Sequence, residues 1–273
     1  TDVDVEDDFL AGIASHFKRP DVFSVGSREV QGKNFFTTVK FRYGIFWYKQ
    51  EPADELIDFP VQVLYNSGGY SAFCRDKFLE LGGFDEIYSP FYFEDIDLCY
   101  RAWKRGWKSL WDPSSVVRHD FQGTISQDRR SASISRIHWR NRFLFTWKNI
   151  SSFYFILKHF LFLPFELLLL PFAGKGFFTV GFCLALWRLC RACSGRSPSE
   201  DKVVFSDRQI IKKFNRPPGK VKNILYIDIY GNMAGGGQVS LLSLVRKLNK
   251  ERFRPIVVCP EYGSFTDILA DEG

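Results

Sequence analysis

The stretch GGFDEIYSPFYFEDIDLCYRAWKRGW, residues 82–107, decides the fold of this 273-residue chain. Three carboxylates, Glu94, Asp95 and Asp97, stand between an aromatic run and a segment with helical spacing. A carboxylate beside apolar walls has a raised pKa and can take a proton from a hydroxyl at neutral pH. The same residues also suit the first turn of a helix, where acidic groups offset the macrodipole. From the residues alone, both interpretations stay open.

Residues 1–150 alternate short runs with strand and helix patterns, which is typical of an α/β domain. Helices are expected over 9–17, 75–81, 94–104 and 137–149, and strands over 22–25, 61–65, 107–111 and 116–118. Glycines follow the second and third of these helices, where a left-handed residue commonly ends a helix. This part of the chain is therefore expected to form one α/β domain.

Composition narrows the possible functions. Hydrophobic residues make up 45% of the chain, enough for ordinary cores, and 273 residues favour two domains. The net charge of +6 fits an anionic partner such as a nucleotide sugar or an acidic lipid surface. Lys and Arg form no long block, which argues against nucleic acid as a partner. Six scattered cysteines in mostly apolar contexts indicate a reducing cytoplasm.

Residues 151–193 are far more apolar and include the runs FYFILKHFLFLPFELLLLPF, 153–172, and GFFTVGFCLALWRLC, 176–190. Prolines interrupt the first run and the second is short, so neither is a clean span of about 20 apolar residues. We expect helices that lie in a membrane interface or cap the preceding domain, with a shallow membrane hairpin as the alternative. The protein would then be peripheral at the inner face of the membrane. Residues 194–220, rich in Ser, Pro and Gly, are expected to be a linker.

A new pattern begins at residue 221. VKNILYIDIY, residues 221–230, reads as a strand, and GNMAGGGQ, 231–238, as a glycine-rich loop. A helix over 239–248 and a strand over 255–260 follow. This order predicts a βαβ unit that opens a second Rossmann-like domain over residues 221–273.

The stretch 82–107 resembles the GGFDE…F…EDxDLxxRxxxxGW signature of family 2 glycosyltransferases, which have the GT-A fold. The likeness holds in register through Gly82, Glu94, Asp95, Arg101 and Trp107. It implies an inverting transfer of a sugar from a nucleotide-diphosphate donor to a hydroxyl, with Asp95 as the general base. Glu94 is expected to bind the acceptor or to order the loop. Residues 1–150 would be the C-terminal part of a GT-A domain, and the chain a piece of a longer protein.

Two residues are candidate metal ligands through the same resemblance. TDVDVEDDFL, residues 1–10, resembles the family's modified DXD region, which makes Asp2 the metal-binding aspartate. His119, after a strand pattern, matches a histidine that reaches the metal in the family. Carboxylate and imidazole suit Mg²⁺ or Mn²⁺, and such a divalent cation stabilises charge on a departing diphosphate. Without the resemblance, the acidic residues read as a charged turn and His119 as a structural histidine.

Small residues mark further candidate contacts. Gly68 and Gly69 match a family segment beside the donor sugar, where glycine allows close backbone approach. Without the resemblance, an ordinary strand-to-helix turn is the better explanation of these glycines. Tyr92 is a candidate for the acceptor side. In the second domain, Gly235, Gly236 and Gly237 open a helix whose N-terminus suits a phosphate, and the segment resembles the start of family 4 glycosyltransferases of the GT-B fold.

We expect a glycosyltransferase that acts on a glycan or lipid-linked saccharide at a membrane surface. The QxxRW element of processive family 2 synthases has no match here, which favours addition of one or a few sugars. Two other classes stay open. The chain could be a catalytically silent membrane-associated scaffold of glycan assembly. It could also be an NAD-type dinucleotide-binding protein, although residues 231–238 lack a clean GxGxxG.

Overall fold

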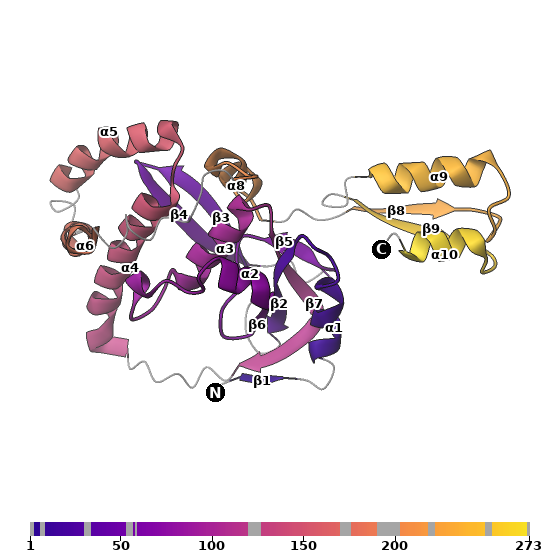
Figure 1. The fold of residues 1–273 in the computed structure, drawn as a ribbon, viewed down its shortest axis with the longest axis horizontal. Helices are drawn as coiled ribbons and strands as arrows, with labels where there is room; N and C mark the ends of the chain where they lie inside the picture. The colour runs from indigo at the N-terminus through magenta and orange to yellow at the C-terminus, as the bar shows by residue number, and fades with distance from the viewer. Residues whose placement is uncertain are drawn as a thin grey trace. The chain divides into compact units, whose positions relative to one another are not determined.

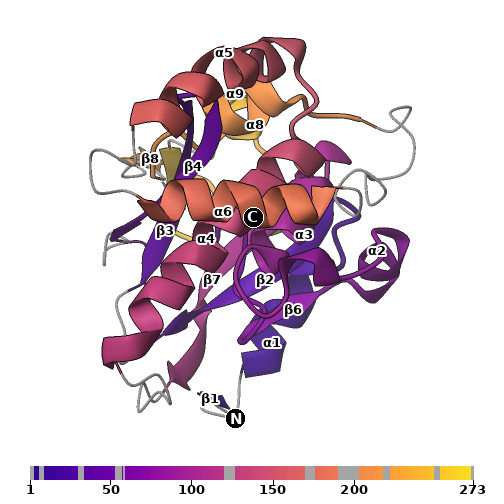
Figure 2. The same ribbon diagram turned by 90° about the vertical axis from the view of Figure 1, so that its left-hand side faces the viewer.

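The computed structural model describes residues 3–5, 9–29, 34–52, 57, 59–119, 127–169, 176–189, 203–217, 222–248 and 253–271. The chain forms two compact units, residues 1–217 and 218–273. The ribbon of the two units is drawn in Figure 1 and turned in Figure 2.

A five-stranded mixed sheet forms the centre of the first unit. Its strands are β1 (Val3–Val5), β2 (Val22–Glu29), β5 (Val61–Val63), β6 (Ser71–Phe73) and β7 (Lys108–His119). The order is β1-β7-β2-β6, and β5 pairs with the opposite end of β7 from β1. Among the described strands of this sheet, only β2 and β7 pair in parallel, and the other pairs are antiparallel. Strand β2 is buried along nearly its whole length, as expected for a central strand.

The prediction of two strands around Asp112 and Pro113 is wrong, because β7 is continuous. Its register with β2 shifts between the pairs Ser27–Asp112 and Arg28–Val116, so residues 113–115 bulge out. Such a bulge lets Pro113, which has no N–H to donate, lie within a strand without ending it.

Helices cover the sheet close to where the sequence predicts them. They are α1 (Phe9–His16), α2 (Arg75–Glu80) and α3 (Glu94–Lys104), with a short 3-10 helix, η1 (Glu86–Tyr88), before α3. Helix α3 has the predicted bounds. Its residues Leu98, Cys99 and Ala102 pack with Phe23 of β2 in one core cluster. The sheet and α3 therefore fix each other through apolar contacts.

A hairpin that the sequence analysis did not predict adds a second layer of strands. Strands β3 (Phe35–Arg42) and β4 (Ile45–Pro52) pair antiparallel in full register. Their two-residue turn is Tyr43-Gly44, and both residues have a left-handed φ, 50° and 72°. Glycine suits this conformation, which matches the twist of paired strands.

Three helices build the side of the unit beyond the hairpin: α4 (Gln127–Asn149), α5 (Phe153–Leu169) and α6 (Gly176–Trp187). Helix α4 is longer than predicted, and α6 packs closely on it: a Cβ on Gly181 would lie 2.4 Å from Trp139 Cβ. The α5 residue His159 bonds Trp147 of α4 through Nε2 at 2.9 Å and Gly44 of the hairpin through Nδ1 at 2.7 Å. None of the helices in the described ranges is long and apolar enough to cross a membrane.

Part of the stretch predicted as a linker, residues 194–220, is a helix that packs on the first unit. Helix α8 (Asp207–Lys213) begins at a Ser206–Gln209 capping box. Ile210, Ile211 and Phe214 are buried in the main core cluster of the first unit. The polar composition of the stretch hid these three apolar residues, whose helical spacing places them on one face.

The second unit confirms the predicted βαβ order. Strand β8 (Lys222–Ile227), helix α9 (Gly236–Lys247) and strand β9 (Phe253–Val258) follow one another, and α10 (Ser264–Asp271) comes after them. Strands β8 and β9 pair in parallel, which a connection that crosses over through α9 makes possible. The GT-B domain expected here is not established by this short unit.

Candidate functional site

The candidate site is built around the aromatic loop that enters α3. Tyr92 and Phe93, directly before Glu94, both have a left-handed φ, 71° and 79°. Bulky residues adopt this conformation only when the surroundings impose it. The side chain that holds this backbone in place is Asn141 of α4. Its Nδ2 lies 2.8–2.9 Å from the carbonyl oxygens of Tyr88, Phe91 and Tyr92. Helix α4 thus fixes the backbone that presents the carboxylates.

The neighbouring Arg140 holds the same loop. Its Nη2 donates to the carbonyl oxygens of Tyr88 at 3.2 Å and Ser89 at 2.6 Å. Sequence analysis missed Arg140 and Asn141, because they lie far from the loop in sequence and no local pattern connects them to it.

Asp97 is a structural carboxylate. It is fully buried, and its oxygens accept from Tyr88 Oη at 2.8 Å, Arg101 Nε at 2.8 Å, Lys148 Nζ at 3.0 Å and Asn149 Nδ2 at 2.7 Å. Burial by itself would raise the pKa of Asp97, but the two cations and the hydrogen bonds more than offset it, so the pKa is lowered. Asp97 stays ionised and ties η1, α3 and α4 together.

Asp95 lies in a different environment, although it is only two residues away. Burial, and then the charge of Glu94, raise the pKa of Asp95 to about 7, against the opposing effect of backbone N–H groups of Ile96, Asp95 and Gly68. Its Oδ1 accepts from the Ile96 N–H at 2.8 Å. Glu94 Oε2 is shielded from solvent and has no hydrogen-bond partner. Asp95 can therefore take or give a proton near neutral pH.

The glycine segment predicted beside the donor sugar lies next to Asp95. The Gly68 N–H is close enough to lower the pKa of Asp95. A Cβ on Gly68 would lie 3.3 Å from Phe84 Cζ, whereas one on Gly69 would meet only Ser67 Oγ, at 3.8 Å. Packing within the protein thus restricts Gly68 more than Gly69.

Tyrosines surround Asp95. The pKa of Tyr48 is raised to about 12, first by burial and partly by the charges of Asp95 and Glu94. The pKa values of Tyr65 and Tyr70 are also raised, first by burial and partly by Asp95. Tyr65 and Tyr70 flank the glycine segment in sequence, while Tyr48 comes from β4. The charge of Asp95 thus raises the pKa of tyrosines from two parts of the fold, β4 and the residues around the glycine segment.

A second group of side chains, missed by sequence analysis, lies beside Tyr48. Tyr48 Oη lies 3.0 Å from His138 Nε2, and the Tyr92 ring is 5.1 Å from the His138 ring, centroid to centroid. Burial, and then the charge of Arg142, lower the pKa of His138 to about 4, so this imidazole is neutral at pH 7. Tyr92, exposed by 37%, lies at the rim of this group. This is the surface on which an acceptor sugar could stack.

Arg142 is buried without a carboxylate partner among the described residues. Its guanidinium lies 4.4 Å from the Trp47 ring and 4.8 Å from the Trp139 ring, and its Nε has no hydrogen-bond partner. Burial lowers its pKa to about 10, which still leaves it charged at pH 7. The cation is held by aromatic faces instead of an ion pair.

The metal prediction is not tested. Asp2 lies outside the described residues, and of His119 only the backbone is described, paired with Val3 across β1 and β7. The described ranges contain no group of three or more His, Cys, Asp or Glu residues that could hold a metal ion.

In the second unit, the three candidate glycines lie at the start of α9. Gly235 is the N-cap, and a Cβ on Gly235, Gly236 or Gly237 would meet nothing within 4 Å. Gln238, the next residue, donates from Nε2 to Asp228 Oδ1 at 2.8 Å, which ties the helix start to the end of β8. The glycines thus lie at the start of a helix, as predicted, and their contact with a phosphate stays a prediction.

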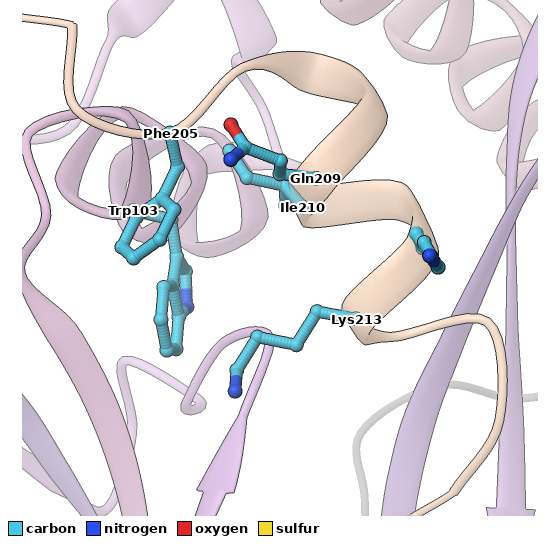
Figure 3. Close-up of a pocket in the computed structure, with 6 residues that line it drawn as sticks. Trp103, Phe205, Gln209, Ile210 and Lys213 are labelled. Carbon is cyan, nitrogen blue, oxygen red and sulfur yellow. The ribbon is translucent and has the colours of Figure 1, made fainter.

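A cavity of about 380 Å³ lies elsewhere, between α3 and α8 (Figure 3). Its lining residues are Trp103, Phe205, Gln209, Ile210, Lys212 and Lys213. Trp103 is near the C-terminal end of α3 and Asp95 near its N-terminal end, roughly 12 Å away along the helix axis. The cavity is therefore separate from the candidate site.

Parts of the chain are similar to known proteins. Over 79 residues the chain is 37% identical to N-acetylglucosaminyl-diphospho-decaprenol L-rhamnosyltransferase from two strains of Mycobacterium tuberculosis. The match covers 29% of this chain and only 25% of each relative. A crystal structure of GalNAc-T7 with UDP, GalNAc and Mn²⁺ is 17% identical, with a TM-score of 0.37 over 50% of this chain and 29% of that one. No protein-family model matches the chain.

Proposed function

We propose that the first unit belongs to an inverting glycosyltransferase, which moves a sugar from a nucleotide-diphosphate donor to a hydroxyl of a glycan or lipid-linked acceptor. The observation that carries the proposal is the Asp95 carboxyl, whose pKa is about 7, beside a glycine segment and a group of aromatic rings. The similarity to rhamnosyltransferases over 79 residues supports the same reaction class.

In this reaction Asp95 takes the proton from the acceptor hydroxyl. The acceptor oxygen forms a bond to the anomeric carbon of the donor sugar while the bond from that carbon to the diphosphate oxygen breaks. The nucleoside diphosphate leaves with the electron pair, and the configuration inverts because there is a single displacement. Glu94 raises the proton affinity of Asp95, and Asn141 holds the loop in the geometry that presents both groups.

A divalent cation, Mg²⁺ or Mn²⁺, fits the proposal. Asp2 and His119 would hold it, since Asp2 precedes the strand residue Val3 that pairs with His119. When bound, the cation neutralises charge on the diphosphate. Removal of divalent cations with a chelator is expected to weaken nucleotide-sugar binding, and replacing His119 by Ala to weaken it in the same direction. Binding that is unchanged by both would exclude this assignment.

The acceptor is proposed to be lipid-linked, which places the protein at the cytoplasmic face of a membrane. The name of the similar rhamnosyltransferases, which contains a diphospho-decaprenol, supports this proposal. The second unit is proposed as the start of a GT-B domain, with Gly235–Gly237 contacting a phosphate at the N-terminus of α9.

The alternatives give distinct binding results. A silent scaffold would bind no nucleotide sugar at millimolar concentration, with or without Mn²⁺. A dinucleotide-binding protein would bind NAD through the second unit, and replacing Gly236 by Val would abolish that binding. Isothermal titration with UDP-sugars, dTDP-sugars and NAD separates the three.

The test of the base is Asp95→Asn in a transfer assay. Loss of a general base is expected to lower kcat by about 10²- to 10⁴-fold with little change in donor affinity. Asp76→Asn on α2 is the matched control, because Asp76 is exposed and far along the chain from the loop. Turnover of Asp95→Asn that stays near wild type would remove Asp95 from this role.

A further inference from the structure

The outward side of α5 is unusually apolar for a surface helix. Large exposed apolar residues recur along its whole length with helical spacing; they are Phe153, Tyr154, Leu157, Phe160, Leu161, Phe162, Phe165, Leu168 and Leu169. Phe153 is 77% exposed, Phe160 68% and Leu168 64%. A surface helix normally presents polar residues outward, and a continuous apolar surface of this kind marks an interaction site. We call these nine residues the α5 stripe.

The stripe continues at its N-terminal end into a cationic surface on α8. Arg208 and Lys212 of α8 are exposed, as are Lys213 and Arg216. The only acid of the helix, Asp207, is buried and paired with Lys104 at 3.0 Å. The α8 surface therefore has a net positive charge without carboxylates of its own to neutralise it.

The two surfaces are joined by direct contacts. The Arg208 guanidinium lies 5.2 Å from the centre of the Tyr154 ring of the stripe, and Lys158 Nζ lies 4.5 Å from the same ring. Both views of the ribbon place α5 and α8 along the same edge of the first unit (Figures 1 and 2). An aromatic hydroxyl at the boundary between an apolar face and cations is typical of side chains at a membrane–water interface.

We propose that the α5 stripe and the α8 cations form a docking surface for an anionic phospholipid bilayer, with α5 lying in the plane of the interface. The apolar side chains would enter the acyl boundary while Arg208, Lys212 and Lys158 contact lipid phosphates. A second copy of the same surface is a poorer occupant, because it would bring further cations, while α5 and α8 offer only the half-buried Glu166 and the buried Asp207 as carboxylates. The proposal deepens the proposed function, since a lipid-linked acceptor has to be met at such a surface.

Vesicle flotation of the full chain tests the proposal, with no donor or acceptor present. Binding is expected to vesicles of phosphatidylcholine mixed with phosphatidylglycerol and to be much weaker with phosphatidylcholine alone. The combined variant Leu157→Gln, Phe160→Gln, Leu168→Gln is expected to lower partitioning by more than about tenfold. Arg208→Gln with Lys212→Gln is expected to lower it by about 25-fold on the anionic vesicles only, at roughly fivefold for each cation.

Matched controls change the same residue types elsewhere. Leu10→Gln with Leu79→Gln removes exposed leucines of α1 and α2, and Lys18→Gln with Arg75→Gln removes an exposed lysine and an exposed arginine outside the surface. Both controls are expected to stay within about twofold of wild type, because a leucine, lysine or arginine that does not touch the bilayer contributes little to partitioning. Circular dichroism confirms that each variant is folded.

Folded wild-type protein that floats with neither vesicle would overturn the proposal. So would a dimer that forms without vesicles and is lost in the α5 variant, because the stripe would then be covered by a second copy. Equal binding to both vesicle types, unaffected by Arg208→Gln with Lys212→Gln, would remove the cations from the surface. Flotation that behaves as expected in a protein without transferase activity would leave this surface in place and count against the proposed function alone.

Discussion

Asp95 and Asp97 are two residues apart in the first turn of α3, and the fold treats them in opposite ways. Asp97 accepts hydrogen bonds from four side chains, two of them cations, and its pKa is lowered. Asp95 has its pKa raised to about 7 by burial and then by the charge of Glu94, against the opposing effect of backbone N–H groups. The difference shows that the acidic motif contains two kinds of carboxylate: Asp97 holds helices together, and Asp95 can take or give a proton near neutral pH.

The largest expected effect is on stability, from Asp97→Ala. Removing this carboxylate leaves Lys148 and Arg101 buried beside each other without their shared partner. The free energy of unfolding is expected to fall by about 3–5 kcal/mol. Urea denaturation measures it, and Asp95→Asn should cause no comparable loss. Equal losses of unfolding free energy in the two variants would show that Asp97 is no more important for stability than Asp95.

The two carboxylates should also give opposite pH dependences of stability. The folded-state pKa of Asp95 is above its unfolded value, so the folded protein binds more protons and stability falls as pH rises from about 4 to 7. Asp97, with a lowered pKa, contributes stability above its unfolded pKa that is lost as pH falls through the folded pKa. Asp95→Asn should remove the first slope, a change on the order of 2–4 kcal/mol between these pH values. Urea denaturation as a function of pH measures it, and a slope retained in the variant would contradict the assignment.

Asn141 tests whether the strained loop presents Asp95. Asn141→Asp keeps the shape but replaces a donor by an acceptor facing three carbonyl oxygens. We expect a loss of about 1–3 kcal/mol in stability and a fall in kcat larger than any rise in KM. Asn34→Asp, which alters a side chain bonded to the Glu29 backbone outside the site, is the matched control. A variant with normal kcat would show that the loop needs no such support.

The smallest expected effect is from Glu94→Gln. Removing the neighbouring negative charge favours ionised Asp95, so its pKa should fall. The acid limb of the pH–rate profile is then expected to move to lower pH by about one unit or less. A shift to higher pH, or none, would mean that Glu94 does not act on Asp95 electrostatically.

Local pattern was enough to predict some of this architecture. The bounds of α3 follow from the spacing of Leu98, Ala102 and Trp103 and from Gly106 after the helix. The βαβ order of the second unit follows from its apolar runs and glycines. The hairpin of β3 and β4 was missed, although Tyr43-Gly44 lies between residues with strand propensity, because no clean alternation marks its strands.

Sequence reasoning could predict only part of the candidate site. Asp95, Glu94 and Gly68 belong to local motifs and lie close together. Tyr48, His138 and Arg142 could not be placed there, because they come from the unpredicted hairpin and from α4, and only tertiary packing joins them. The resemblance supplied Asp2 and His119, whose side chains lie outside the described residues.

The hydrogen bonds of His159 connect three elements of the first unit. Because Nε2 accepts from the Trp147 indole N–H, the ring proton is on Nδ1 and donates to the Gly44 carbonyl. One imidazole thus joins α5 to α4 and to the tip of the hairpin. Helix α4 in turn holds the loop before Asp95 through the hydrogen bonds of Asn141. If α5 binds lipid and Asp95 is the base, as proposed, a displacement of α5 on the membrane would reach Asp95 through α4.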